Sequence, residues 1–166
     1  IMGHHIGDND SFGAAIGLYR VGKTIGKKTH IVLGDVSGSV VPLVDEFKNS
    51  DSYDEDMFIT GPEAVSEMTK NDALIIVDCN RASYTEYPEL VRRAQCIIVF
   101  DHHRQGSEQV VNPILSYIEP YASSASEMVA EILQYFTEGI RIRNVEADSI
   151  YAGIMIDTNN FVNSTG

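Results

Sequence analysis

The chain has 166 residues, of which 43% are hydrophobic and 22% charged, a balance typical of one globular domain with a sizeable core. No apolar stretch is long enough to cross a bilayer, and no signal peptide opens the sequence. The formal net charge of -12 argues against a surface that holds long nucleic acid, because such surfaces are basic.

Strand and helix patterns alternate along the N-terminal part of the chain. Ile1-Met2 predicts the stub of a strand, which leads to a helix with Ala15, Ile16 and Tyr19 inward. Short apolar runs predict further strands at 31–33, 57–59, 73–77 and 96–100. Helices are predicted between them at 40–48, at 62–68 and from Pro88. This alternation predicts an α/β fold, a doubly wound and mainly parallel sheet flanked by helices.

Two longer helices are predicted in the C-terminal part. The first covers 124–136, and its apolar side carries Met128, Val129, Ile132, Leu133 and Phe136. The second covers 145–156, with apolar residues at helical spacing that are Ala147, Ile150, Tyr151, Ile154 and Met155. Because no repeat or linker interrupts these patterns, residues 1–166 are expected to form one domain. Cys79 and Cys96 match no zinc pattern and are expected to be free thiols.

Polar residues follow three of the predicted strands. Asp78 ends one apolar run, Asp101-His102-His103 ends the next, and the opening stub leads to His4, Asp8 and Asp10. Ligands of an open parallel sheet bind beyond the carboxyl ends of its strands, so these groups are expected at one edge. Asp157 adds a further acid directly after the long apolar helix.

The convergent set contains four carboxylates and two imidazoles: His4, Asp8, Asp10, Asp78, His102 and Asp157. Carboxylates packed together repel one another unless cations neutralise them. Two metals that share a bridging carboxylate can use all six ligands and still leave room for a substrate. Oxygen-rich ligands with imidazole and without thiolate suit manganese, iron or cobalt better than a structural zinc.

Each group also has a structural interpretation. Asp8 or Asp10 can cap the first helix, and Ser124 with Glu127 forms the sequence of a capping box. The free amides at that helix start can instead meet a phosphate, which leaves Ser124 as a candidate substrate contact. Gly13 and Gly17, one helical turn apart, are expected to allow close packing of a helix on the sheet.

The combined motifs resemble those of the DHH phosphoesterase superfamily. His4-xxx-Asp8-x-Asp10 lies upstream of Asp101-His102-His103, and the resemblance covers nearly the whole chain in motif order. Within the superfamily, the stretches 3–18, 118–131 and 152–161 resemble the GdpP-type cyclic di-AMP phosphodiesterases. One departure is Asn80, where that type carries histidine; the position is not an expected metal ligand.

The resemblance implies a two-metal enzyme that hydrolyses cyclic di-AMP to the linear dinucleotide pApA. It assigns His4, Asp8 and Asp78 to one Mn²⁺, with Fe²⁺ or Co²⁺ as substitutes. It assigns Asp10, Asp78, His102 and Asp157 to the other, so that Asp78 is the bridge. Among the catalytic residues, His103 would orient the substrate and Asp101 would brace the loop. Arg104 is a candidate phosphate contact, with an exposed, solvated arginine as the alternative.

The resemblance also implies a second, DHH-associated domain that binds the substrate. The chain contains no Gly-Gly pair of the kind that this domain carries, so the domain is expected to be absent and turnover by residues 1–166 alone to be weak. The expected partner is a small nucleotide, without direct membrane contact by this domain; a homodimer stays open. The expected location is the cytoplasm, with a membrane anchor elsewhere in the parent left open.

Three rival functions remain at this stage, besides a pyrophosphatase, which the stretches after His103 disfavour. The first is hydrolysis of short oligoribonucleotides or of 3'-phosphoadenosine phosphate, by another member of the same superfamily. The second, from a different class, is a non-catalytic nucleotide-binding sensor that has lost its metals. The third is a purely structural α/β domain whose acids cap helices.

Overall fold

The strands of the computed structural model are all parallel and form two short sheets; the structure describes residues 1–136 and 139–162. In the first, β1 (Ile31–Val32) pairs with β2 (Phe58–Ile59). In the second, the order is β3 (Ala73–Val77), β4 (Cys96–Asp101) and β5 (Leu115–Ile118). Met2 forms parallel bridges to Val32 and Ile76 and so joins the two sheets. The parallel α/β prediction is confirmed.

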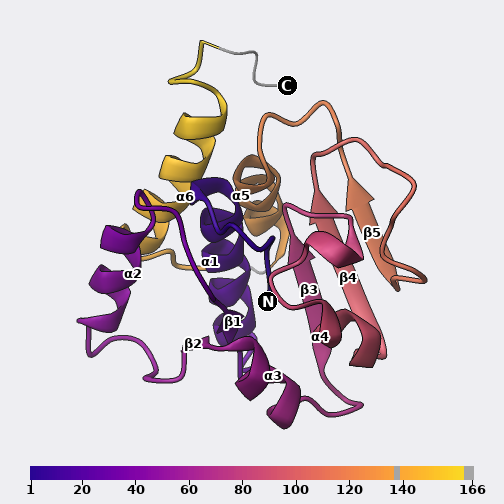
Figure 1. The fold of residues 1–166 in the computed structure, drawn as a ribbon. Helices are drawn as coiled ribbons and strands as arrows, with labels where there is room; N and C mark the ends of the chain where they lie inside the picture. The colour runs from indigo at the N-terminus through magenta and orange to yellow at the C-terminus, as the bar shows by residue number, and fades with distance from the viewer. Residues whose placement is uncertain (137–138, 163–166) are drawn as a thin grey trace.

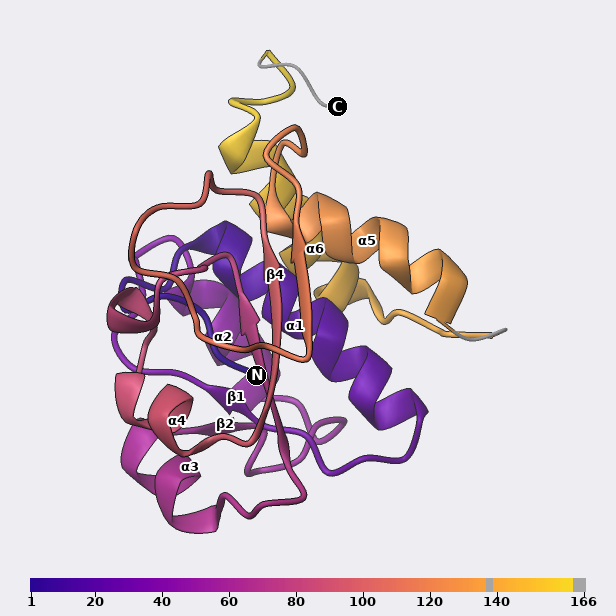
Figure 2. The same cartoon turned by 90° about the vertical axis from the view of Figure 1, so that its right-hand side faces the viewer.

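Helices cover both faces of this joined sheet (Figure 1). Figure 2 shows α1, α5 and α6 on one side of β4, and α3 and α4 on the other. This arrangement is the doubly wound one that the alternation of elements predicted. The helices are α1 (Asn9–Thr24), α2 (Val41–Lys48), α3 (Gly61–Glu67), α4 (Pro88–Arg93), α5 (Ala125–Phe136) and α6 (Asn144–Asp157), with the short 3-10 helix η1 (Ala82–Tyr84).

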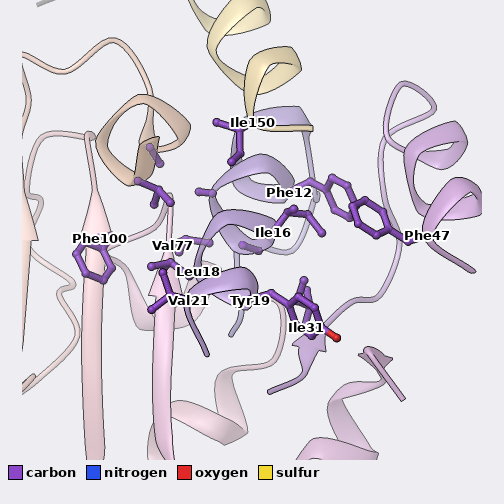
Figure 3. Close-up of a cluster of buried hydrophobic side chains, with 14 of the residues drawn as sticks. Phe12, Ile16, Leu18, Tyr19, Val21, Ile31, Phe47, Val77, Phe100 and Ile150 are labelled. Carbon is purple, nitrogen blue, oxygen red and sulfur yellow. The ribbon is translucent and has the colours of Figure 1, made fainter. Parts of the chain in front are cut away.

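The central strands divide their side chains between two apolar cores. Val77 and Phe100 belong to the core that α1 dominates, which Figure 3 shows around Phe12, Ile16 and Tyr19. Ile76 and Val99, one position earlier in each strand, belong to the core beneath α3 and α4. Side chains alternate across a strand, so strands buried on both faces need continuous apolar runs, as these two have.

Glycines allow α1 to pack closely on other helices. A Cβ added to Gly13 would come within 2.6 Å of the Ser149 carbonyl oxygen on α6. A Cβ added to Gly17 would come within 2.5 Å of the Val129 side chain on α5. The close approach predicted for Gly13 and Gly17 is therefore present, but it joins helix to helix and not helix to sheet.

Two features differ from the sequence-based expectation. β5 was missed, because three of its four residues are exposed and no apolar run marks it.

The buried face of α6 consists of Glu146, Ser149, Ile150 and Gly153, whereas Ala147 and Tyr151 of the apolar stripe are exposed. Small residues are buried there because they let α6 approach α1. The carboxylate of Glu146 is buried because Arg20 donates hydrogen bonds to both of its oxygens.

Candidate metal centre

The candidate site lies at the carboxyl ends of β3 and β4, as predicted. Asp78 directly follows β3 and has a φ of 55°, a left-handed conformation that non-glycine residues rarely adopt. Its backbone N–H donates to the Phe100 carbonyl oxygen on β4 at 2.8 Å, which holds the turn in place. The side chain of Asp78 is almost fully buried and points into the cluster of predicted ligands.

One group of ligand atoms comes from the N-terminal loop and Asp78. The His4 Nε2 atom lies 3.5 Å from Asp8 Oδ1 and 3.3 Å from Asp78 Oδ2. Asp8 is also the N-cap of α1, because its Oδ1 accepts a hydrogen bond from the Ser11 N–H. The helix cap and the ligand position are thus compatible, and the three residues together could hold one ion.

A second group comes from α1, the β4 end and α6. The His102 Nε2 atom lies 3.6 Å from Asp10 Oδ2 and 3.6 Å from Asp157 Oδ2. These three residues also place ligand atoms close enough to share an ion. Asp157 is the last residue of α6, so the packing of α6 against α1 sets its position relative to Asp10.

Asp78 connects the two groups. Its Oδ2 faces His4, while its Oδ1 lies 3.4 Å from His102 Nε2. Asp78 Oδ1 and His102 Nε2 are buried and have no hydrogen-bond partner among the described residues. Buried polar atoms without partners are costly, and a cation between them would satisfy both. The donor set therefore fits divalent ions, with Asp78 as the shared ligand.

In the absence of a metal ion, the charges of the cluster shift the pKa values of its own members. Hydrogen bonds to the carboxylates of Asp78 and Asp8 raise the pKa of His4 to about 10. Burial lowers the pKa of His102, but the negative charges of Asp78 and Asp10 outweigh it and bring that pKa to about 9. Burial and the charge of Asp78 raise the pKa of Asp10 to about 7. Without metal, the cluster thus holds protons to balance its carboxylates.

Asp10 is anchored by the start of α5. Its Oδ2 accepts a hydrogen bond from the Ala125 N–H and its Oδ1 one from the Ser126 N–H, both at 2.7 Å. Free N–H groups at a helix start attract a carboxylate, so α5 fixes Asp10 and its orientation toward His102. Sequence reasoning missed this contact; the free amides predicted to meet a phosphate are used by Asp10.

Asp101 and His103 form a pair beside the cluster. Asp101 is fully buried. Its Oδ1 atom accepts a hydrogen bond from the His103 backbone N–H at 3.1 Å and lies 2.8 Å from the His103 Nδ1 atom. This contact raises the pKa of His103. The exposed ring of His103 also lies near Asp78, with Nδ1 3.5 Å from Oδ1. Asn80 donates to Asp101 Oδ2 and to the His103 carbonyl oxygen, a bracing role that sequence reasoning did not assign.

Arg104 and Ser124, the two residues proposed to contact substrate, lie in different environments. Arg104 is exposed and forms no ion pair with any described residue, so its side chain is free to meet an anion. Ser124 is buried, and its hydroxyl accepts from the Glu127 N–H at 3.0 Å. This is half of the expected capping box; the Glu127 carboxylate binds Ser123 instead. These contacts favour capping over substrate contact for Ser124.

Other expectations concern features outside the cluster. Cys79 and Cys96 are both free, as predicted. In the part of the chain that the structure describes, no helix combines the length and apolar character that a membrane crossing requires. The cytoplasmic location, the anchored parent and the homodimer stay predictions.

The sequence matches a known protein family and several relatives. The sequence model of the DHH family, N-terminal domain, matches residues 1–154. The chain is 40% identical, over its whole length, to the cyclic-di-AMP phosphodiesterase GdpP of Bacillus subtilis, of which it covers 25%. It is also 34% identical over 107 residues to a probable manganese-dependent inorganic pyrophosphatase of Thermotoga maritima; the match covers 64% of this chain and 18% of that protein. The chain thus spans about a quarter or less of these curated relatives.

A solved structure supports the fold alone. An exopolyphosphatase-related protein from Bacteroides fragilis superposes with a TM-score of 0.75 at 22% identity. The match covers 96% of this chain and 46% of that one.

Proposed function

The chain belongs to the DHH family, and from this membership we propose that it is the metal-binding domain of a phosphodiesterase that hydrolyses cyclic di-AMP to pApA. The similarity to a cyclic-di-AMP phosphodiesterase over the whole chain supports the substrate class. We further propose two Mn²⁺ ions as cofactors, which the similarity to a manganese-dependent pyrophosphatase supports.

The observation that carries the proposal is the position of Asp78 between two groups of ligand atoms. His4 and Asp8 lie on one side of it, and His102 lies on the other, with Asp10 and Asp157 beyond. Such a set of ligands would hold two cations through a shared carboxylate. When bound, the ions would polarise the phosphodiester and lower the pKa of a water molecule, the chemistry that two-metal hydrolases use.

The protein's own residues have supporting tasks in this reaction. The Asp101 carboxylate holds the Nδ1 side of the His103 ring, so the exposed Nε2 is the nitrogen available to a phosphate oxygen or a leaving hydroxyl. Buried Asp10 is fixed by the amides of α5 and keeps His102 in position.

The three serine hydroxyls around the start of α5 are engaged in structural contacts. Ser123 binds Glu127, Ser124 caps α5, and Ser126 donates to the Asp10 backbone oxygen. No candidate nucleophile therefore emerges from this group, in agreement with attack by water.

The proposal is tested by metal content and hydrolysis together. The chain and its Asp78→Ala variant are incubated with Mn²⁺, desalted, and assayed for bound metal and for conversion of cyclic di-AMP to pApA. We expect about two ions per chain, fewer in the variant, and slow turnover that the variant lacks. A folded chain that binds no metal would instead support the sensor alternative. Bound metal with turnover of short oligoribonucleotides or 3'-phosphoadenosine phosphate, and none of cyclic di-AMP, would support the related hydrolases.

A further inference from the structure

We propose that His5, Arg81 and Tyr84 form a stacking platform that receives a nucleobase of the substrate while its phosphate lies at the metal centre. The inference rests on the proposed function and adds a specificity site to it. These three residues are exposed and lie outside the predicted ligand set.

The platform is built around the Tyr84 ring. The Arg81 guanidinium carbon lies 5.5 Å from the centroid of this ring, within the range of a cation–π contact. The His5 ring meets Tyr84 edge-on, with centroids 5.6 Å apart. Tyr84 keeps half of its surface exposed. The result is a guanidinium and two rings held together at the surface, a composition that stacks planar bases.

Backbone hydrogen bonds fix the platform to the metal loop. The His5 N–H donates to the Tyr84 carbonyl oxygen at 3.0 Å, and the Glu86 N–H donates to the Gly3 carbonyl oxygen at 2.9 Å. Between them, His4 and Thr85 form an antiparallel bridge. Because His5 directly follows His4, a predicted metal ligand, these hydrogen bonds hold the platform next to the metal centre.

The loop after His103 also contacts the platform. The Ser83 hydroxyl donates to the Glu108 carboxylate at 2.8 Å. A Cβ added to Gly106 would come within 3.1 Å of the Arg81 Nη2 atom, so Arg81 lies directly against this loop. The platform is therefore in contact with both loops that carry His4 and His103.

Charge supports a nucleotide as the occupant. The chain carries 24 acidic and 12 basic residues, yet Arg81 forms no ion pair with any described residue. An arginine with a free charge attracts phosphate oxygens, and its planar face stacks on bases. A nucleotide presents both groups, whereas an inorganic phosphate presents only one.

The test compares a nucleotide with its base-free counterpart. Binding of AMP and of ribose 5-phosphate to the Mn²⁺-loaded chain is measured by calorimetry. We expect AMP to bind more tightly, and Tyr84→Ala to weaken AMP by about 5-fold or more without changing ribose 5-phosphate. Tyr84→Phe should retain AMP binding, because the ring remains. Tyr135→Ala, at an exposed tyrosine of α5, is the matched control and should change neither ligand.

The outcomes separate the platform from the proposed function. Equal binding of both probes by the unmodified chain, or unchanged AMP binding in Tyr84→Ala, would overturn the platform and leave the proposed function standing. Equal weakening of both probes in Tyr84→Ala would also overturn it, in favour of a structural role. Binding of neither probe to the metal-loaded chain would also overturn the platform, while metal content and hydrolysis of cyclic di-AMP would decide the proposed function separately.

Discussion

The side-chain amide of Asn80 donates a 2.5 Å hydrogen bond to the carboxylate of Asp101. Both residues are buried, and Asp101 in turn holds His103 through its backbone N–H and its ring. An amide cannot lose its donor by titration in the working pH range, so this contact keeps Asp101 oriented toward His103. Asn80 therefore takes part in positioning His103, although its side-chain amide donates to no predicted metal ligand.

Replacing Asn80 by alanine should destabilise the protein. The change leaves the buried Asp101 Oδ2 without its donor, which costs about 1–3 kcal/mol. Urea unfolding followed by circular dichroism measures the loss. Asn80→His keeps an N–H donor and should lose less, while Asn71→Ala, at an exposed asparagine, is the control. Equal stability of Asn80→Ala and the unmodified chain would show that the contact with Asp101 is dispensable.

The two groups of ligands predict different metal losses. His4→Ala should remove one of the two proposed Mn²⁺ ions and Asp157→Ala the other, because each belongs to one group only. Asp78→Ala should reduce both. Metal per chain is measured by plasma mass spectrometry after incubation and desalting. Asp148→Ala changes an exposed carboxylate of α6 and should leave the content unchanged. Identical losses in His4→Ala and Asp157→Ala would argue against two distinct ion positions.

Metal binding should strengthen as the pH rises. The pKa of His4 is raised to about 10 and that of His102 to about 9, so both imidazoles carry a proton at neutral pH in the metal-free chain. A metal ion needs the neutral imidazole and must displace that proton. The apparent affinity for Mn²⁺ should therefore increase from pH 6 to pH 8, with release of protons. Calorimetry in two buffers of different ionisation enthalpy measures the release; an affinity independent of pH would contradict the assignment of these ligands.

The edge of the sheet that carries the site was predictable because the opening stub and two of the apolar runs lead directly to polar residues. Asp78 and His102 follow such runs, and parallel strands bring their carboxyl ends together. The contact between Asp10 and the amides of Ala125 and Ser126 was not predictable. It joins residues that are distant in the sequence, and backbone N–H groups leave no side-chain signal.

Only part of the buried face of α6 was predictable, for a related reason. Apolar periodicity points correctly to Ile150, which is buried, but also to Ala147 and Tyr151, which are exposed. Close contact with α1 buries small side chains such as Ser149 and Gly153, which the apolar pattern does not mark.

Gly153 couples that packing to the metal centre. A Cβ at this position would come within 2.9 Å of the Asn9 carbonyl oxygen and 3.0 Å of the Asp10 Cα atom, and backbone cannot yield as a side chain can.

Gly153→Ala should push α6 away from α1, at a cost of about 1–3 kcal/mol for overpacking that outweighs the roughly 1 kcal/mol gained from alanine in a helix. Since Asp157 lies one turn further along α6, its distance from Asp10 and His102 should also increase. Thermal unfolding and Mn²⁺ titration measure the two effects. Gly38→Ala, where an added Cβ meets nothing within 4 Å, is the matched control. Lower stability with unchanged Mn²⁺ binding would show that the position of Asp157 does not depend on the contact between α1 and α6.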